Sequence, residues 1–277
     1  MEYTSKYNVR NTMYQQFENS ATERTTNPCL YYYNNTLSWN ETSELVDKCA
    51  AALVANGVKK GDRVIVCLPN MPQCVAAVYA INKIGAIASM LHPLSVKSEA
   101  DYTINLVGAK FAFCFDVSEK SFQNHPELTV VMCRTAQYFP KTVYGLAANM
   151  MYKKKIKGKT GPAENVKKLI DWADFMKEGG KYIAEHGVPE TETDYTATAA
   201  IMMTGGTTGN PKGVMLSSEN INNLSYELVD VVEDTLGMAI DKDNDGMLTA
   251  LPVFHGFGFA LCMHVSMCVG MAQALSL

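Results

Sequence analysis

The chain has 277 residues, of which 47% are hydrophobic and 19% charged, and its formal net charge is −4. This balance is that of an ordinary soluble globular protein in one large domain or two smaller ones, and nothing in it calls for nucleic acid as a partner. The eight cysteines form no C-x-x-C pair and no metal-binding spacing, and the first residues are not those of a signal peptide. We therefore expect a reducing, cytoplasmic location.

The first half of the chain alternates helical and strand-like patterns. An amphipathic helix is predicted within the first twenty residues, then two short strands at 30–33 and 36–39, and a helix from an Asn40 cap to Asn56. Further strands are predicted at 63–68, 86–90, 111–115 and 128–132, with helices at 72–84 and 98–107. Strands that alternate with helices in this way indicate crossover units and a mainly parallel sheet.

Residues 135–190 read as a basic, partly helical excursion. Residues 141–181 contain ten lysines and four acidic residues, a net charge of +6, so that the rest of the chain carries −10. The lysine-rich run Lys153–Lys159 is most simply a solvated surface, because runs of like charge are usually exposed. The alternative is weak peripheral contact with an anionic membrane, which would help to capture a lipid-like acid. A helix is predicted at 165–177.

A glycine- and threonine-rich stretch, Thr204–Gly213, follows the apolar run 199–203. It has little apolar surface to pack, but it offers backbone N–H groups, threonine hydroxyls and the Lys212 cation to a phosphate. It matches neither the Walker pattern G-x-x-x-x-G-K-[ST] nor the dinucleotide pattern G-x-G-x-x-G. The residues alone leave two interpretations, a polyphosphate cradle and a flexible hairpin loop whose threonines cap backbone groups.

The whole string T-G-G-T-T-G-N-P-K-G-V resembles the phosphate-binding loop of the adenylate-forming superfamily, which includes acyl-CoA synthetases, luciferases and peptide-synthetase adenylation domains. The earlier strings N-G-V-K-K-G-D-R-V, from Asn56, and L-P-N, from Leu68, resemble the N-terminal signature of the same superfamily. The resemblance implies an α/β fold with mainly parallel sheets flanked by helices. It also implies that the loop holds the β,γ-phosphates of ATP, with Mg²⁺ near Thr204, through Thr204, Gly205, Gly206, Thr207, Thr208, Gly209 and Lys212.

A second string, L-P-V-F-H-G-F-G-F, runs from Leu251 to Phe259 after a strand-like run at 246–251. A lone histidine among aromatic residues is by default a half-buried structural residue. The string, however, resembles the acyl-CoA synthetase segment in which a histidine faces the carboxylate of the acid substrate. The resemblance implies a catalytic His255 and an acyl channel lined by Phe254, Gly256, Phe257 and Gly258. The string lacks the aspartate with which peptide synthetases hold an amino group, which favours an acid without one.

Both strings follow strand-like runs, 199–203 and 246–251, at their carboxyl ends. Ligands gather at the carboxyl ends of parallel strands, so two adjacent strands would deliver both strings to one crevice. We therefore expect the His255 side chain within about 10–12 Å of the Thr204–Gly209 backbone, in a pocket shared with Phe254 or Phe257.

Two other stretches imitate known motifs. Residues 241–246 begin like a calcium-binding loop, but the twelfth position, which must supply a bidentate glutamate, is Pro252. We interpret them as a polar loop before a strand. Residues 257–277 contain no charged side chain and reach transmembrane length. Their glycines, His264 and Gln273 favour a buried helix that runs into a strand.

The predicted function is that of an AMP-forming acyl- or aryl-acid:CoA ligase that uses ATP, Mg²⁺ and CoA. The alternatives are a peptide-synthetase-like adenylation domain and a non-catalytic nucleotide- or acid-binding module. No Y-G-x-T-E string, no T-G-D string and no small C-terminal domain with an adenylation lysine appears before Leu277. We therefore expect residues 1–277 to be the N-terminal portion of an AMP-binding domain that is inactive by itself.

Overall fold

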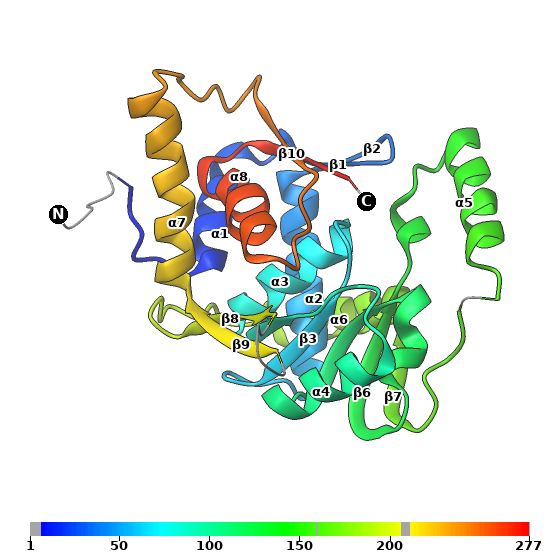
Figure 1. The fold of residues 1–277 in the computed structure, drawn as a ribbon. Helices are drawn as coiled ribbons and strands as arrows, with labels where there is room; N and C mark the ends of the chain where they lie inside the picture. The colour runs from blue at the N-terminus through cyan, green and yellow to red at the C-terminus, as the bar shows by residue number, and fades with distance from the viewer. Residues whose placement is uncertain (1–6, 159, 206–210, 277) are drawn as a thin grey trace.

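The computed structural model describes residues 7–158, 160–205 and 211–276, and the statements below concern these residues. Two sheets share one hydrophobic core (Figure 1). Helices α1 (Met13–Arg24), α2 (Trp39–Ala55) and α3 (Pro72–Lys83) also contribute side chains to this core. The smaller sheet has the order β10-β11-β1-β2, and its strands are β1 (Pro28–Tyr32), β2 (Asn35–Ser38), β10 (Gly246–Thr249) and β11 (Ala272–Leu275).

The larger sheet has seven strands in the order β7-β6-β5-β3-β4-β8-β9. Every neighbouring pair in it is parallel except β8–β9, which confirms the predicted α/β fold with a mainly parallel sheet. Its strands are β3 (Arg63–Cys67), β4 (Ile87–Met90), β5 (Phe111–Phe115), β6 (His125–Cys133), β7 (Val166–Asp171), β8 (Thr198–Thr204) and β9 (Lys212–Ser217).

Strand β3, near the middle of the larger sheet, is buried on both faces, whereas the edge strands β7 and β9 are mostly exposed. Val64 and Val66 of β3 belong to the main core with α3, whereas Ile65 and Cys67 belong to a second cluster. That cluster contains Ile104 of α4 (Lys97–Val107). Because successive side chains of a strand point to opposite faces, helices on both sides require a continuous apolar run, and β3 has one.

Two boundaries differ from those expected. Helix α2 begins two residues earlier, with Ser38 and not Asn40 as its N-cap: the Ser38 hydroxyl accepts from the Glu41 N–H, and the Glu41 carboxylate accepts from the Ser38 N–H. The predicted helix at 165–177 is wrong, because β7 occupies its first half and pairs with β6. Apolar residues at 166, 169, 170 and 173 gave a helical spacing, but backbone pairing with β6 overrides that local pattern.

The second half of that stretch is helix α6 (Trp172–His186), which Asp171 caps by accepting from the Ala173 N–H. Helix α6 packs against α2 so closely that a Cβ on Gly179 would overlap the carbonyl oxygen of Lys48. The predicted excursion at 135–190 therefore divides into two parts. Strand β7 and helix α6 belong to the main body, and the preceding residues, with α5 (Val143–Ile156), stand away from it at the side of the molecule (Figure 1).

The last described residues form the buried helix and strand expected there. They are η4 (Gly258–His264), α8 (Val265–Val269) and β11, which pairs with β1 and β10. No helix among the described residues has the length and apolar character needed to cross a membrane. Residues 241–245 form an exposed polar loop before β10, as predicted, after helix α7 (Ser218–Asp230) and the irregular turn η3 (Val231–Thr235).

Candidate functional site

The glycine- and threonine-rich loop joins β8 to β9, two antiparallel strands at the edge of the larger sheet. Both described ends are held in place: the Thr204 hydroxyl donates to the Lys212 carbonyl oxygen at 3.3 Å, and the Tyr102 hydroxyl donates to that of Pro211 at 2.8 Å. Thr204, Gly205, Pro211 and Lys212 are exposed, as expected for a loop that receives a ligand. The predicted cradle residues Gly206, Thr207, Thr208 and Gly209 lie outside the described residues.

The His255 segment is positioned by Asn70, a buried side chain just beyond β3. The Asn70 amide donates to the carbonyl oxygens of Thr249, at 2.8 Å, and Leu251, at 3.1 Å, and accepts from the Val253 N–H at 3.0 Å. One side chain thus satisfies three backbone groups of a segment without regular structure. It thereby fixes the path of the chain into Phe254 and His255.

One cavity brings the loop and the His255 segment together. It has a volume of about 690 Å³, and both described residues at the start of the loop, Thr204 and Gly205, line it with Phe254 and His255. His255, Phe254 and the described start of the loop thus line one cavity, whereas the expected separation and the roles of these residues stay predictions. Phe257, Gly256 and Gly258 do not line this cavity; Phe257 is 60% exposed, and Gly258 is packed against the Pro252 carbonyl.

We expected the strands before the two strings to be neighbours in one sheet. That expectation is wrong, because β8 and β10 are not adjacent. β8 lies in the larger sheet, and β10 is an edge strand of the smaller one. The cavity lies between the two sheets' loops. The hydrogen bonds of Asn70, and not pairing between β8 and β10, hold the segment that begins at Leu251 close to the loop.

His92 also lines the His255 cavity, although no motif in the sequence contains it. It follows β4, whose neighbour in the sheet is β8, so the rule about carboxyl ends of adjacent strands would have found it. Its Nδ1 accepts from the Leu94 N–H at 3.0 Å, and its ring packs on Phe254 with 4.6 Å between ring centroids. Phe254 in turn lies against His255, at 4.7 Å, so the two imidazoles flank one aromatic ring.

The sequence model of the AMP-binding enzyme family matches residues 17–276. The chain belongs to the AMP-binding enzyme family. Among curated relatives it is similar to the long-chain-fatty-acid–CoA ligases of Bacillus subtilis, 26% identical over 88% of this chain and 42% of that protein, and of Salmonella typhimurium, 28% identical over 90% and 44%. The chain therefore spans less than half the length of these relatives.

Solved structures show the same fold. MbtA of Mycobacterium smegmatis in its apo form has a TM-score of 0.71 at 20% identity, over 96% of this chain and 44% of that one. A long-chain-fatty-acid-CoA ligase from Archaeoglobus fulgidus has a TM-score of 0.69 at 20% identity, over 99% and 49%. These likenesses establish the α/β fold of adenylate-forming enzymes for this member of the AMP-binding family.

The cavity of this AMP-binding family member carries few charges. Its titratable side chains among the described residues are His92, His255, Tyr102 and Glu99, and the Glu99 carboxylate accepts from the Val96 N–H at 3.3 Å. The exposed Thr204 hydroxyl is an oxygen of the kind that Mg²⁺ binds, and its loop position suits a metal held together with a phosphate. Among the described residues no three His, Cys, Asp or Glu side chains gather as metal ligands.

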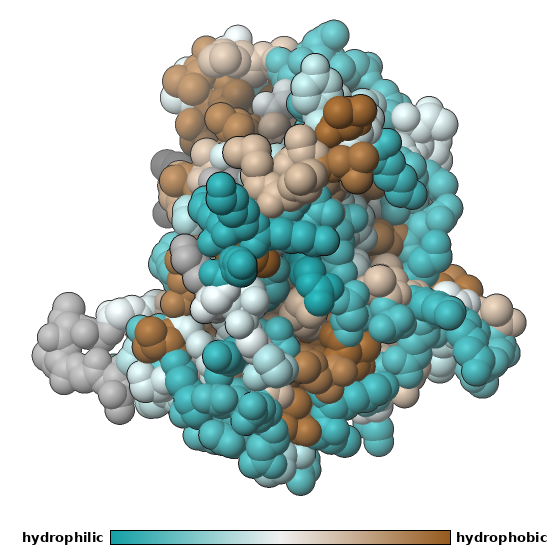
Figure 2. Space-filling view, turned by 90° about the vertical axis from the view of Figure 1, so that its right-hand side faces the viewer, coloured by the Kyte–Doolittle hydropathy of each residue, from teal (hydrophilic) through white to brown (hydrophobic). Residues whose placement is uncertain are grey.

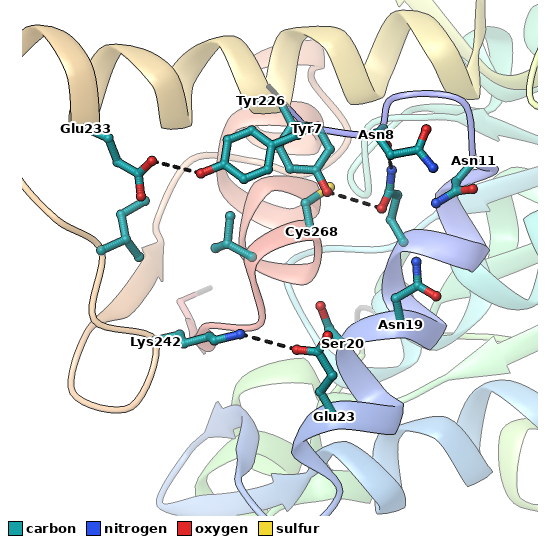
Figure 3. A pocket seen from close by; sticks show the side chains of 13 residues that line it. Tyr7, Asn8, Asn11, Asn19, Ser20, Glu23, Tyr226, Glu233, Lys242 and Cys268 are labelled. Atoms are coloured by element: carbon teal, nitrogen blue, oxygen red, sulfur yellow. Dashed lines mark hydrogen bonds and ion pairs between the residues drawn. The ribbon is translucent and has the colours of Figure 1, made fainter. Parts of the chain in front are cut away.

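A second cavity of the AMP-binding family member, of about 410 Å³, lies among α1, α7 and α8 (Figure 3). Tyr7 stacks on Tyr226 with 4.6 Å between ring centroids, and the Tyr7 hydroxyl donates to Glu233 at 2.8 Å. The Lys242 ammonium group forms an ion pair with the Glu23 carboxylate at 3.3 Å, at the lower side of the cavity in Figure 3. Each of its charged side chains has a partner, Glu23 with Lys242 and Glu233 with the Tyr7 hydroxyl, and the cavity shares no lining residue with the His255 cavity, so we assign it to packing of the N-terminal segment.

Proposed function

We propose that this chain is the N-terminal part of an AMP-forming acid:CoA ligase that acts on an acyl or aryl carboxylic acid. The observation that carries the proposal is the single cavity shared by the start of the glycine-rich loop and by His255. An acid can be activated only where its carboxylate meets the α-phosphorus of ATP, so a phosphate-binding loop and a carboxylate-binding group must open into one space.

The proposed reaction has two steps. The carboxylate oxygen attacks the α-phosphorus of ATP, which forms an acyl-adenylate and releases pyrophosphate. The thiol of CoA then attacks the acyl carbon, which forms a thioester and releases AMP. In the first step the protein supplies position and charge compensation for the phosphates. Mg²⁺, bound with ATP near Thr204, would reduce the negative charge that the attacking carboxylate must approach.

The residues of the cavity have distinct proposed roles. Thr204 and Gly205, with the rest of the loop and Lys212, hold the β,γ-phosphates. His255 donates a hydrogen bond to the carboxylate, and Phe254 keeps the ring of His255 in place. His92, on the other side of Phe254, buttresses that ring. The curated relatives named above are long-chain-fatty-acid–CoA ligases, which supports a fatty acid as the substrate.

ATP–pyrophosphate exchange by the native gene product tests the proposal. Exchange should depend on an added fatty or aryl acid. His255→Ala should slow it by about 10²–10⁴, the range usual for a group that acts on the reacting atoms, and leave the fold unchanged. The matched control is His186→Ala, because His186 is an exposed histidine at the end of α6, which lines no part of the cavity. Fatty-acid binding without any exchange would favour a non-catalytic acid-binding module.

We also propose a peripheral contact between helix α5 and an anionic membrane. Lys153, Lys154 and Lys155 are exposed in its last turns, and Lys157 is exposed just beyond. The same helix exposes Val143, Leu146, Met150 and Met151, each by at least 66%. Hydrophilic and hydrophobic side chains gather in separate areas on the side of the molecule that carries α5 (Figure 2). Exposed apolar side chains next to lysines suit a surface of anionic lipid.

A further inference from the structure

A cavity of about 760 Å³ lies between α5 and the main body, apart from the His255 cavity. This volume is within the range of small-molecule sites, about 300–1,000 Å³. Tyr152 and Ile156 of α5 form one wall, and Phe115 and Val117, at the end of β5, form another. We call this space the α5 cavity.

Several of the hydroxyl groups that line the α5 cavity are already engaged in hydrogen bonds within the protein. The Ser118 hydroxyl donates to the carbonyl oxygen of Phe115 at 2.9 Å, and the Ser121 hydroxyl donates to that of Ser95 at 2.8 Å. An apolar ligand would leave these two donors paired. The Thr135 hydroxyl, which also lines the cavity, is buried without a hydrogen-bond partner among the described residues and is a polar point in a wall that otherwise includes Phe115, Val117 and Ile156.

One cation stands at the edge of this apolar space. Tyr152 holds α5 to the body by donating to both carboxylate oxygens of Asp116, at 2.6 and 2.8 Å. Lys155 follows three residues later, on the same side of the helix, and it lines the cavity while remaining exposed. Among the described residues no carboxylate forms an ion pair with the Lys155 ammonium group.

The α5 cavity adjoins the His255 cavity. Leu94, Ser95 and Val96 line both, and they are the segment that separates them. The side chains of Leu94 and Val96, two residues apart, are both large, apolar and exposed to solvent, by 63% and 58%. This segment thus offers apolar surface to a ligand on each of its two sides.

We propose that the α5 cavity binds the alkyl chain of a long-chain carboxylate, with the carboxylate at Lys155, as a site distinct from the position of the reacting acid at His255. The apolar walls select the chain, and the unpaired ammonium group selects an anionic head. The choice of a carboxylate rests on the proposed function, whereas the choice of an apolar chain does not. The site lies beneath the helix proposed to touch anionic lipid, so it would receive a fatty acid from that surface.

Isothermal titration of the purified full chain with laurate, below its micelle concentration and without ATP, tests the proposal. Affinity should rise with chain length from caprylate to laurate, by up to about fourfold per fully buried methylene. Ile156→Asp places a carboxylate in the cavity, and Lys155→Glu reverses the charge at its edge. Each should weaken laurate binding by about tenfold or more. Lys154→Glu is the matched control, because Lys154 lies on the same helix and does not line the cavity. It should change the affinity less than twofold.

Photolabelling locates the bound chain without any substitution. A fatty acid with a diazirine on its alkyl chain should label peptides that contain residues 115–118 or 152–156, which line the α5 cavity and not the His255 cavity. Labelling confined to residues 254–258, or loss of laurate binding in His255→Ala with Ile156→Asp unaffected, would overturn the α5 site and leave the proposed ligase activity standing. Equal weakening by Lys154→Glu and Lys155→Glu would also overturn it, because the lysines would then act only as a general charge. Absence of ATP–pyrophosphate exchange with normal laurate binding would contradict the ligase proposal alone.

Discussion

At the scale of single residues, a few buried polar side chains fix the parts of the chain that have no regular structure. Asn70 does so for the segment before His255, and His264 does so for the N-terminal segment. His264 lies between the Tyr79 hydroxyl, 2.8 Å from its Nδ1, and the Asn222 side-chain oxygen, 2.7 Å from its Nε2. Because the Asn222 amide nitrogen donates to the carbonyl oxygens of Val9, at 2.9 Å, and Asn11, at 2.8 Å, the Asn222 oxygen accepts and Nε2 carries the proton.

Replacing Asn70 should cost stability at this scale. Asn70→Ala removes one donor from the carbonyl oxygens of Thr249 and Leu251 and removes the acceptor of the Val253 N–H. The Thr249 oxygen keeps the Ser276 N–H at 3.3 Å, whereas a buried group left without any partner costs about 1–3 kcal/mol. Relaxation and water entry reduce the sum, so the free energy of unfolding should fall by about 2–4 kcal/mol in urea titrations. Asn40→Ala, at an exposed position of α2, should change it by less than about 0.5 kcal/mol. Equal effects of the two substitutions would remove the positioning role of Asn70.

The buried imidazole of His264 should make stability depend on pH. Burial lowers the pKa of His264 from 6.5 to about 3 in the folded protein. Between these values the unfolded chain binds a proton that the folded chain does not, so stability falls as the pH decreases below 6.5. The contribution is at most about 1.4 kcal/mol for each pH unit. In urea titrations at pH 7, 6 and 5, the free energy of unfolding of His264→Gln should change with pH by up to this amount less than that of the wild type. The control is His186→Gln, at an exposed site, whose free energy of unfolding should change with pH as the wild type's does.

At the scale of elements, close packing of helices decides which local changes are tolerated. Helix α6 has adjacent glycines at 179 and 180. A Cβ on Gly179 would overlap the Lys48 carbonyl of α2, whereas a Cβ on Gly180 would meet nothing within 4 Å. The first glycine is therefore needed for the contact between the helices, and the second only weakens α6.

Substitution of these two glycines should have opposite effects. Gly179→Ala forces α6 away from α2 and should lower the free energy of unfolding by about 1–3 kcal/mol, the usual cost of overpacking. Gly180→Ala should raise it by about 0.5–1 kcal/mol, since alanine favours the helix and limits the unfolded chain. Thermal unfolding monitored by circular dichroism measures both. Destabilisation by Gly180→Ala would show that α6 packs differently from the arrangement described.

Helix α5 differs from α6 in that its apolar side chains face solvent. If it meets anionic membrane, the protein should sediment with vesicles that contain phosphatidylserine, and 0.5 M salt should release it, because screening weakens the attraction of exposed lysines. Changing Lys153, Lys154 and Lys157 together to glutamate should abolish the interaction. Lys177, Lys181 and Lys168, changed in the same way on the α6 side of the molecule, serve as the control. Sedimentation that is absent, or insensitive to salt, would leave the lysines as an ordinary solvated surface.

At the scale of the whole molecule, the two sheets matter because their loops meet at one cavity. The larger sheet supplies the loop after β8 and His92 after β4, and the smaller sheet supplies His255 after β10. The same core reaches into both sheets, with Leu30 and Leu275 on one side and Val64 and Val66 on the other. Relative movement of the sheets would therefore disturb the core, which keeps the two halves of the cavity in register.

We expect that residues 1–277 alone do not complete the proposed reaction, since they span less than half the length of the curated relatives they match. Purified 277-residue chain, ATP, Mg²⁺, CoA and a fatty acid should give no acyl-CoA by mass spectrometry. The native gene product under the same conditions is the control. Thioester formation by the 277-residue chain would contradict this expectation.

The sequence by itself determined the local structure wherever one pattern dominated. The apolar runs of β3, β5 and β8 specified buried strands, and the string around Thr204–Lys212 specified a loop between two strands. It was insufficient for β7, where apolar residues at 166, 169, 170 and 173 predicted a helix and pairing with β6 made the first half a strand. Side-chain periodicity reports which face is buried, not which partner buries it.

Tertiary structure alone decided how the cavity is assembled. Sequence order suggested that the strands before the two strings were neighbours, yet they lie in different sheets, and a single buried amide, Asn70, brings His255 to the loop. The L-P-N string from Leu68 contains Asn70, but nothing in the string shows that the Asn70 side chain bonds to Val253, 183 residues later. Such contacts depend on the path of the backbone through space, because a hydrogen bond is set by distance and angle between atoms and not by their spacing along the chain.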